Sequence, residues 1–480
     1  MSSPGTIVWF RQDLRLHDNP ALAAAVARGG WTLPVYILCD EEEGDWPMGG
    51  ASRWWLHESL TALAAAISER GSRLLLQYGA ALDVIRTLIK RSGADAVYWN
   101  RRYEPAVIER DGAIKQALHD DGIVAASFNG ALLAEPWDVR SPTHQSYRVF
   151  TPFKKRLLEC LAVPGALTTP AQLPGPPHWP QSLRTLELLP TLKWYSRMSR
   201  HWQPGERGAS RRAREFLARP LSGYAAARNT PAIDGTSSLS PHLHFGEISV
   251  RQLWRSAQSA AKRRAAPASA WHESTFASEL IWREFAYHLL YYHPRSALEP
   301  LDQRFERFAW RADRTLQNAW QRGQTGFPIV DAGMRQLWAI GWMHNRVRMI
   351  VASLLIKNLR QPWLQGARWF WDTLVDADLA ANTMNWQWSA GSGADAAPFF
   401  RIFNPVTQGE RFDPNGEYVR RWVPELAGVP TQFIHMPHLA PSDVLQSAGV
   451  RIGQTYPAPL LDLKQSRQEA LMAYRAMRQC

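Results

Sequence analysis

The chain has 480 residues, enough for two or more domains with sizeable cores, and its 55 Lys and Arg residues against 43 Asp and Glu residues give a formal net charge of +12. This charge favours a polyanionic partner such as nucleic acid, although a soluble basic protein without such a partner would show the same excess. Three cysteines, no signal or transit peptide at the N-terminus and no apolar run of membrane-spanning length argue against a secreted, disulfide-bonded or membrane protein, and predict a cytoplasmic one.

Short apolar runs alternate with helix-like segments over roughly residues 1–130. Asn19 and Pro20 supply a capping side chain and a proline suited to a first helical turn. We expect strands at 7–10, 33–38, 74–77, 96–99 and 123–128, and helices at 21–27, 52–69, 82–90 and 105–118. The alternation predicts an α/β domain with a doubly wound parallel sheet. Residues 11–15, after the first strand, lack the glycines of a dinucleotide-binding turn, so we do not expect one there.

A connecting segment and a helical region follow. Prolines are frequent between Leu161 and Pro190, where they disfavour both helix and sheet, so residues 131–205 are expected to form an interdomain linker. From Glu206 onward, apolar residues recur at three- and four-residue spacing, which predicts an all-α domain over 206–480. Its helices are expected at 206–218, 247–264, 271–292, 313–322, 328–357 and 366–376.

Two early segments of the helical region carry polar groups with two interpretations each. Residues 235–241 place four hydroxyls before helical sequence, which suits either a phosphate-binding loop or an ordinary helix cap. Glu279, Trp282 and Arg283 share one face of a predicted helix. They form either a surface ion pair beside a core tryptophan or the lining of a polar pocket.

Two later segments repeat this combination of charged and polar side chains. Asn345, Arg348 and Met349 share a helical face, and residues 376–382 place two carboxylates and an amide near the end of a helix. Arg348 and Asp376 are expected to form a buried pair, which bears on architecture more than on net stability. No HExxH or CxxC pattern occurs, so we expect no metal site.

Tryptophan is unusually frequent, with 23 residues in the chain. Trp386 and Trp388 precede residues 395–405, where aromatic side chains alternate with Arg401. This arrangement suits stacking on unpaired bases and binding of phosphates, whereas a tryptophan pair on a helix is otherwise more often core.

These segments together resemble the DNA photolyase/cryptochrome family, and within it class I cyclobutane pyrimidine dimer photolyases. The resemblance rests on motifs in family-like order: VWFRQDLR at 8–15, WMHNR at 342–346, DLAAN at 378–382, NWQW at 385–388, FRIFNP at 400–405 and WVPEL at 422–426. It implies light-dependent repair of these dimers, by electron transfer from photoexcited reduced FAD to a dimer flipped out of DNA. It also implies that 1–130 is an antenna domain and that 206–480 is the helical FAD- and DNA-binding catalytic domain.

The resemblance assigns a set of cofactor-binding residues. Asn382 would face the reactive ring nitrogen of the flavin, and Phe276 departs from the tryptophan often found at its position, which should alter packing rather than chemistry. The FAD diphosphate would be held by Tyr224, Thr236, Ser237, Ser238, Leu239 and Ser240. The rest of the cofactor would be lined by Phe276, Glu279, Arg283, Trp342, Asn345, Arg348, Asp376, Ala377, Asp378 and Asn382.

The resemblance also assigns the residues that act on DNA and those that pass electrons. The catalytic residues would be Asn382 and five residues that contact the dimer. Of these five, Glu279 and Asn345 would bond its carbonyls, and the others would pack against its bases: Trp282, Met349 and Trp388. DNA contacts would further include Arg228, Arg346, Gln387 and Arg401. A chain from Trp386 through Trp363 to Trp310 would re-reduce oxidised flavin.

Three other functions stay open: a cryptochrome photoreceptor, a (6-4) photoproduct photolyase and a non-catalytic flavoprotein that binds nucleic acid. The expected lack of a long C-terminal tail and Asn382 argue against the first, and Asn345 and Met349, where (6-4) enzymes use histidine chemistry, argue against the second. Ala106 and Val107 replace the Asn-Glu pair of folate-binding members, so a deazaflavin, another flavin-like antenna and an empty antenna site stay open. We expect a monomer that acts on UV-damaged DNA.

Overall fold

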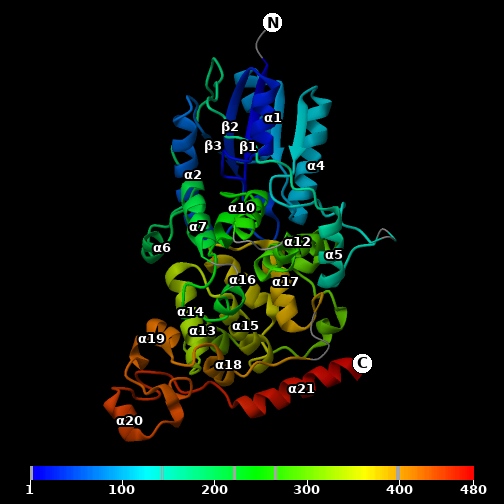
Figure 1. Cartoon of the computed structure of the whole chain (residues 1–480). Coiled ribbons are helices and arrows are strands. Elements are labelled where there is room, and N and C mark those ends of the chain that lie inside the picture. Colours follow the sequence, from blue (N-terminus) through cyan, green and yellow to red (C-terminus); the bar gives the residue numbers. More distant parts are fainter. Residues whose placement is uncertain are drawn as a thin grey trace. The chain divides into compact units, whose positions relative to one another are not determined.

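The computed structural model describes residues 4–141, 143, 145–219, 223–263, 268–395 and 400–479 (Figure 1). The chain forms two compact units. We call the first, residues 1–221, 237–294 and 375–378, the sheet unit, and the second, residues 222–236, 295–374 and 379–480, the helical unit. These two units do not follow the three expected domains, 1–130, 131–205 and 206–480. That division stays a prediction about which part of the chain carries which function.

A five-stranded parallel sheet forms in the sheet unit. Its strands are β1 (Gly5–Phe10), β2 (Trp31–Leu38), β3 (Leu75–Tyr78), β4 (Ala96–Asn100) and β5 (Val124–Phe128). Their order is β3-β2-β1-β4-β5, so the sheet is doubly wound from β1, and the predicted fold class is confirmed. In register, Ile7 lies between Leu33 and Val97.

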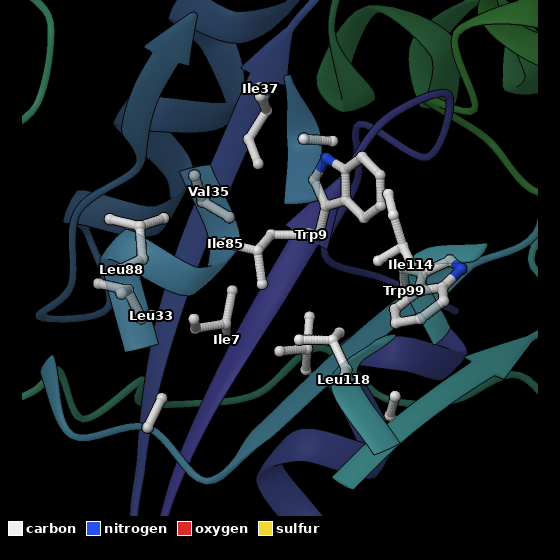
Figure 2. Packing of buried hydrophobic residues seen from close by; sticks show 14 of the residues in the cluster. Ile7, Trp9, Leu33, Val35, Ile37, Ile85, Leu88, Trp99, Ile114 and Leu118 are labelled. Carbon is white, nitrogen blue, oxygen red and sulfur yellow. The ribbon is translucent and has the colours of Figure 1, made fainter. Parts of the chain in front are cut away.

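Alternation along the strands sends one set of apolar side chains into a single core. Ile7 and Trp9 lie on this face, and Trp9 packs 6.0 Å from Trp99 between ring centroids (Figure 2). Helices α3 (Ala81–Ser92) and α4 (Pro105–Asp120) cover it with Ile85, Leu88, Ile114 and Leu118. Full burial of such a side chain contributes about 1.5–3 kcal/mol. The continuous apolar strands therefore specify this buried sheet.

The proline-rich segment has neither helix nor strand between α5 (Phe150–Cys160) and α6 (Ser196–His201), as predicted. It runs along the sheet unit through backbone hydrogen bonds. The N–H of Leu183 donates to the carbonyl of Leu76 over 2.9 Å, and Leu76 donates in turn to the Ser182 hydroxyl over 2.9 Å. The segment thereby satisfies backbone groups of the edge strand β3 that would otherwise be open to pairing.

The remaining α-helices are distributed over both units. Those of the sheet unit are α1 (Pro20–Arg28), α2 (Gly50–Ser68), α7 (Glu206–Ala218), α9 (Ser240–His244), α10 (Val250–Arg263), α11 (Ala268–Glu273) and α12 (Thr275–Tyr292). Those of the helical unit are α8 (Tyr224–Ala227), α13 (Arg314–Gln321), α14 (Pro328–Ile340), α15 (Asn345–Ser353), α16 (Trp363–Thr373), α17 (Leu379–Ala390), α18 (Pro405–Phe412), α19 (Glu417–Trp422), α20 (Ser442–Ser447) and α21 (Leu463–Gln479). Among the residues described, no helix combines the length and apolar character needed to cross a bilayer.

Two predicted helices are each divided in two. The expected helix 271–292 breaks at Ser274, whose side chain caps α12 by accepting from the N–H of Ala277 over 3.1 Å. The expected helix 328–357 breaks after α14, because Gly341 adopts a left-handed φ of 66° and ends that helix. His344 then caps α15, which continues into a π-helical turn at Leu354–Asn358.

Candidate functional site

The hydroxyl loop, residues 235–241, leads into α9, which begins at Ser240. Arg212 of α7 donates from Nε to the Ser237 carbonyl over 2.8 Å and from Nη2 to the Ser238 hydroxyl over 3.3 Å. Ser238 holds a left-handed φ of 50°, and the N–H of Leu239 donates to Ser237 Oγ over 3.3 Å. A guanidinium beside hydroxyls is suited to bind phosphate. Sequence reasoning missed Arg212, because it is separated from the loop by more than twenty residues and no motif marks it.

Asp378 is a buried anion in the sheet unit. It lies with Asp376 and Ala377 in the connection between α16 and α17. The Tyr287 hydroxyl donates to its Oδ2, and His244 Nδ1 lies 3.9 Å from the same oxygen. Burial opposes ionisation of Asp378, but the contact with His244 and the charge of Arg283 outweigh it and lower its pKa to about 2.

Helix α12 presents four of the predicted residues. Trp282 stacks on Phe150 with ring centroids 3.6 Å apart and an interplanar angle of 4°, so Phe150 already covers one face of this ring. Arg283 Nη1 donates to the Ala131 carbonyl over 2.8 Å, and Phe276 packs in the core. Glu279 is half-buried on the same helix. Phe150 was not found from sequence, because it lies on α5, far from the motif that contains Trp282.

A cavity of about 450 Å³ opens in the helical unit, and we call it the arginine cavity. It brings together three predicted residues, Arg346, Met349 and Arg401. Within the described part of the chain its lining contains no carboxylate and consists of Asn229, Arg346, Met349, Arg401, Ile402, Phe403, Asn404, Thr407, Gln408, Arg411 and Phe412. Asn229 and Arg411 were not expected.

Neighbours fix the orientation of Arg346 in this cavity. Its Nη2 donates to Asn229 Oδ1 over 2.6 Å, and its guanidinium lies 4.5 Å from the centre of the Phe412 ring. His344 adds no positive charge nearby. Burial and the charges of Arg346, Arg348 and Arg228 lower the pKa of this histidine to about 4, so it is neutral at neutral pH.

A second, small cavity of about 20 Å³ joins Met349 to Trp388. It shares Met349, Arg401 and Phe403 with the arginine cavity and has room for about one water molecule. Its lining is Met349, Ser353, Lys357, Trp388, Ser389, Gly391, Arg401 and Phe403. Two residues predicted to pack against the dimer, Met349 and Trp388, therefore lie side by side in the helical unit.

Helix α17 and its surroundings hold further predicted residues. Asn382 is buried, and its Nδ2 donates to the Ala367 carbonyl over 3.0 Å. Gln387 is only 1% exposed; its Oε1 accepts from the N–H of Leu301 over 2.8 Å and its Nε2 donates to the Ser296 carbonyl over 2.7 Å. The structure thus gives Gln387 a bracing role for residues 296–301 and no surface for a DNA contact.

The three tryptophans expected to pass electrons differ in exposure. Trp386 is 2% exposed and packs 5.0 Å from Phe370 between ring centroids. Trp363, the first residue of α16, is 5% exposed, and Trp310 is half-buried, 4.5 Å from the Phe308 ring. Trp386 and Trp363 are thus buried and Trp310 is half-buried, and the passage of electrons along the three stays a prediction.

The last group of predicted residues lies at the starts of α8, α9 and α15. Tyr224 begins α8, with the Arg228 guanidinium 5.9 Å from its ring centre. Thr236 and Ser240 flank the serine pair of the hydroxyl loop. Trp342 precedes α15, Asn345 is exposed at its first position, and Arg348 donates to the Met343 carbonyl over 2.7 Å. The described residues contain no group of three or more His, Cys, Asp or Glu able to hold a metal ion.

Known proteins share this sequence and architecture. Residues 6–176 match the family model described as "DNA photolyase", and residues 276–476 match "FAD binding domain of DNA photolyase". A deoxyribodipyrimidine photo-lyase of Agrobacterium fabrum is 50% identical over 98% of both chains, and cryptochrome-2 of Arabidopsis thaliana is 39% identical over 96% of this chain and 77% of its own. A solved structure described as a bacterial class III photolyase from Agrobacterium tumefaciens superposes with a TM-score of 0.95 at 48% identity, covering 100% of this chain and 99% of that one.

Proposed function

The chain belongs to the DNA photolyase/cryptochrome family, and on that premise we propose that it repairs cyclobutane pyrimidine dimers in UV-damaged DNA, using light and reduced FAD. The observation that carries this proposal is the arginine cavity, in which Arg346 and Arg401 lie beside Met349, and Met349 adjoins Trp388. Cations for phosphates and apolar groups for bases thus lie next to each other. The class within the family stays a prediction, since the sequence resembles class I members and the solved structure above is described as class III.

The residues present fit FAD. Arg212 and the hydroxyls of Ser237 and Ser238 suit a diphosphate, and the buried carboxylate of Asp378 suits the N–H groups of a flavin ring. When bound, FAD supplies a single electron after absorbing light, and an extra electron makes a cyclobutane ring easier to open. We expect Asn382, Arg348 and the other residues given above to orient it, and any second chromophore stays a prediction.

The arginine cavity suits the backbone of damaged DNA. Phosphate contacts from Arg346 and Arg401 would fix the position of the strand without reading its sequence. A dimer stacks poorly in the duplex, so flipping it out costs less than flipping normal bases. Trp388 and Met349 would then pack against the dimer, as stacking on aromatic side chains contributes about 1–3 kcal/mol per base.

Side chains of α12 and α15 complete the proposed chemistry. Glu279 and Asn345 would hydrogen-bond the dimer carbonyls, which gain negative charge when the electron arrives. Trp282 would stack on the lesion with its other face supported by Phe150. The buried Trp386 and Trp363 and the half-buried Trp310 would carry electrons that restore the reduced flavin.

The proposal is tested by giving the purified protein, loaded with FAD, oligonucleotides that contain either one cyclobutane thymine dimer or one (6-4) photoproduct. Products are separated by chromatography after blue light and after an equal time in the dark. We expect loss of the cyclobutane dimer in the light alone, and no change in the other lesion. Repair of the (6-4) lesion instead would assign the chain to that activity, and photoreduction of FAD with repair of neither would favour a cryptochrome.

A further inference from the structure

Two side chains one helical turn apart hold the segment that carries Arg401. The Ser353 hydroxyl, at the end of α15, accepts from the N–H of Phe403 over 3.0 Å. Lys357 Nζ, in the π-helical turn, donates to the Arg401 carbonyl over 2.9 Å. Residues four apart lie on the same helical face. We call this pair the Ser353–Lys357 clamp, because its two side chains together bond the backbone of residues 401–403.

Lys357 is an unusual residue to bury. Its side chain is 2% exposed, and its Nζ lies 3.9 Å from the centre of the Phe400 ring. Lys357 also lines the small cavity, together with Met349 and Trp388. Among the described residues no carboxylate acts on its charge, so burial of this amine costs stability and is not compensated by an ion pair. Such a cost suggests a use outside folding.

The surroundings leave Lys357 as the group that titrates here near neutral pH. Burial lowers its pKa to about 7. The helices packed against the π-helical turn are α15, α16, α17 and α21. Helix α17 has no charged residue, and the remaining charged groups of these helices do not contribute to that pKa: Arg346, Arg348, Arg368, Asp372, Lys464, Arg467, Glu469, Arg475 and Arg478.

We propose that the Ser353–Lys357 clamp positions Arg401 for a DNA phosphate and that the protonated amine of Lys357 strengthens this contact. The inference rests on the proposed function. An ammonium is a stronger donor to the Arg401 carbonyl than a neutral amine, and its charge lies at the small cavity, which shares Arg401 with the arginine cavity. The cations that line the arginine cavity itself are arginines, which stay charged, so affinity for DNA should fall as pH rises through the range in which Lys357 loses its proton.

The experiment measures binding of a dimer-containing duplex to the FAD-loaded protein in the dark, between about pH 6 and pH 8.5. We expect the affinity of the wild type to fall about threefold to tenfold over this range, as for the loss of one charge near a phosphate. Lys357→Met keeps the length of the side chain and removes the amine, so this variant should bind more weakly at pH 6 and show little pH dependence. Lys464→Met removes an exposed lysine of α21 and should keep the wild-type pH dependence.

Two further variants separate positioning from a general effect on folding. Ser353→Ala removes the other half of the clamp without changing charge, and should weaken binding at every pH while the pH dependence remains. Because Lys357 acts largely through Arg401, the loss of affinity in Lys357→Met combined with Arg401→Ala should be clearly smaller than the sum of the two single losses. Fully additive losses, or a wild-type pH dependence in Lys357→Met, would overturn the inference alone. A wild-type protein that binds no dimer-containing DNA would overturn the proposed function as well.

Discussion

Arg346 reaches the arginine cavity with its side chain already ordered by Asn229 and Phe412. A guanidinium that is held in place before a phosphate arrives loses less side-chain entropy on binding. We therefore expect Asn229→Ala to weaken binding of dimer-containing DNA by about threefold to tenfold, the effect of a hydrogen bond of about 0.5–1.5 kcal/mol. The measurement is an equilibrium binding curve in the dark.

The control for this change is Asn318→Ala, at an exposed position on α13. It removes the same chemical group and should leave affinity unchanged. FAD content should be the same in both variants and in the wild type. A variant at Asn229 that binds DNA as tightly as the control would show that Arg346 does not need this neighbour.

At the residue scale, sequence motifs predicted the residues that would contact DNA better than the neighbouring residues that hold those side chains in place. Arg346 and Arg401 were predicted to contact phosphates and Met349 to pack against the dimer, and these three residues line one cavity. Asn229 and Phe150 were missed, since each contacts its partner across more than one hundred residues of sequence. Such contacts form only when the chain folds, and no local periodicity records them.

Glu284 of α12 accepts hydrogen bonds from the backbone of residues 133–134, and its protonation makes the stability of the chain depend on pH. Glu284 Oε2 accepts from the N–H of Leu133 over 2.8 Å. Burial raises the pKa of this carboxyl to about 7, against an ordinary value of 4.5. Between these two pH values the folded chain keeps a proton that the unfolded chain has released, so the free energy of unfolding falls as pH rises through this window.

We expect Glu284→Gln to remove this fall, because the amide does not titrate and its oxygen can still accept a hydrogen bond. Relative to wild type, the variant should gain about 1–3 kcal/mol between pH 5 and pH 8, as measured by urea unfolding at both pH values. Glu109→Gln, at an exposed position on α4, should keep the wild-type pH dependence. Parallel curves for Glu284→Gln and wild type would show that Glu284 does not titrate in this range.

Helix α16 packs closely on Trp386 because it has a glycine at the contact. A Cβ on Gly366 would lie 2.2 Å from Trp386 Cη2, so Gly366→Ala should destabilise the chain by about 1–3 kcal/mol. Gly112→Ala is the matched control, since a Cβ there, also within a helix, would meet nothing within 4 Å. It should stabilise by about 0.5–1 kcal/mol through helix propensity, as measured by the same unfolding experiment. An equal effect of both changes would contradict the close packing on Trp386.

Element types were predictable over most of the chain, whereas breaks within helices were not. The expected helix over 328–357 carries a continuous apolar pattern, so its interruption at Gly341 is not visible in the periodicity. The π-helical turn that follows α15 also leaves the apolar pattern intact. This turn contains Lys357, and nothing in the pattern of apolar residues indicates that a lysine there is buried.

At the scale of the whole molecule, a net charge of +12 should make DNA binding strongly dependent on salt. If the three arginines of the arginine cavity each contact a phosphate, the logarithm of the binding constant should fall with the logarithm of salt concentration with a slope of about −3. Arg411→Gln should reduce the magnitude of that slope by about 1. A titration of salt at fixed pH measures both values. A flat response would contradict phosphate contacts by these residues.

The two halves of the chain were predictable from sequence to different degrees. The order of strands and helices in the first 130 residues specifies a doubly wound sheet, because few topologies accommodate a parallel alternation. The boundaries of the two compact units differ from those of the predicted domains. Residues 237–294, expected in the catalytic domain 206–480, belong to the sheet unit. Contacts such as that of Leu133 with Glu284 join the start of the chain to α12, and no composition shift marks them.

The central claim is that light drives one electron from reduced FAD to a dimer bound by this chain. The most direct measurement illuminates the protein, loaded with fully reduced FAD and mixed with an equal amount of a thymine-dimer oligonucleotide, and follows the ultraviolet absorbance that thymine regains when the cyclobutane ring opens. We predict a rise that grows with the light dose and is absent in the dark. Unchanged absorbance after illumination, with both FAD and DNA shown to be bound, would contradict the account.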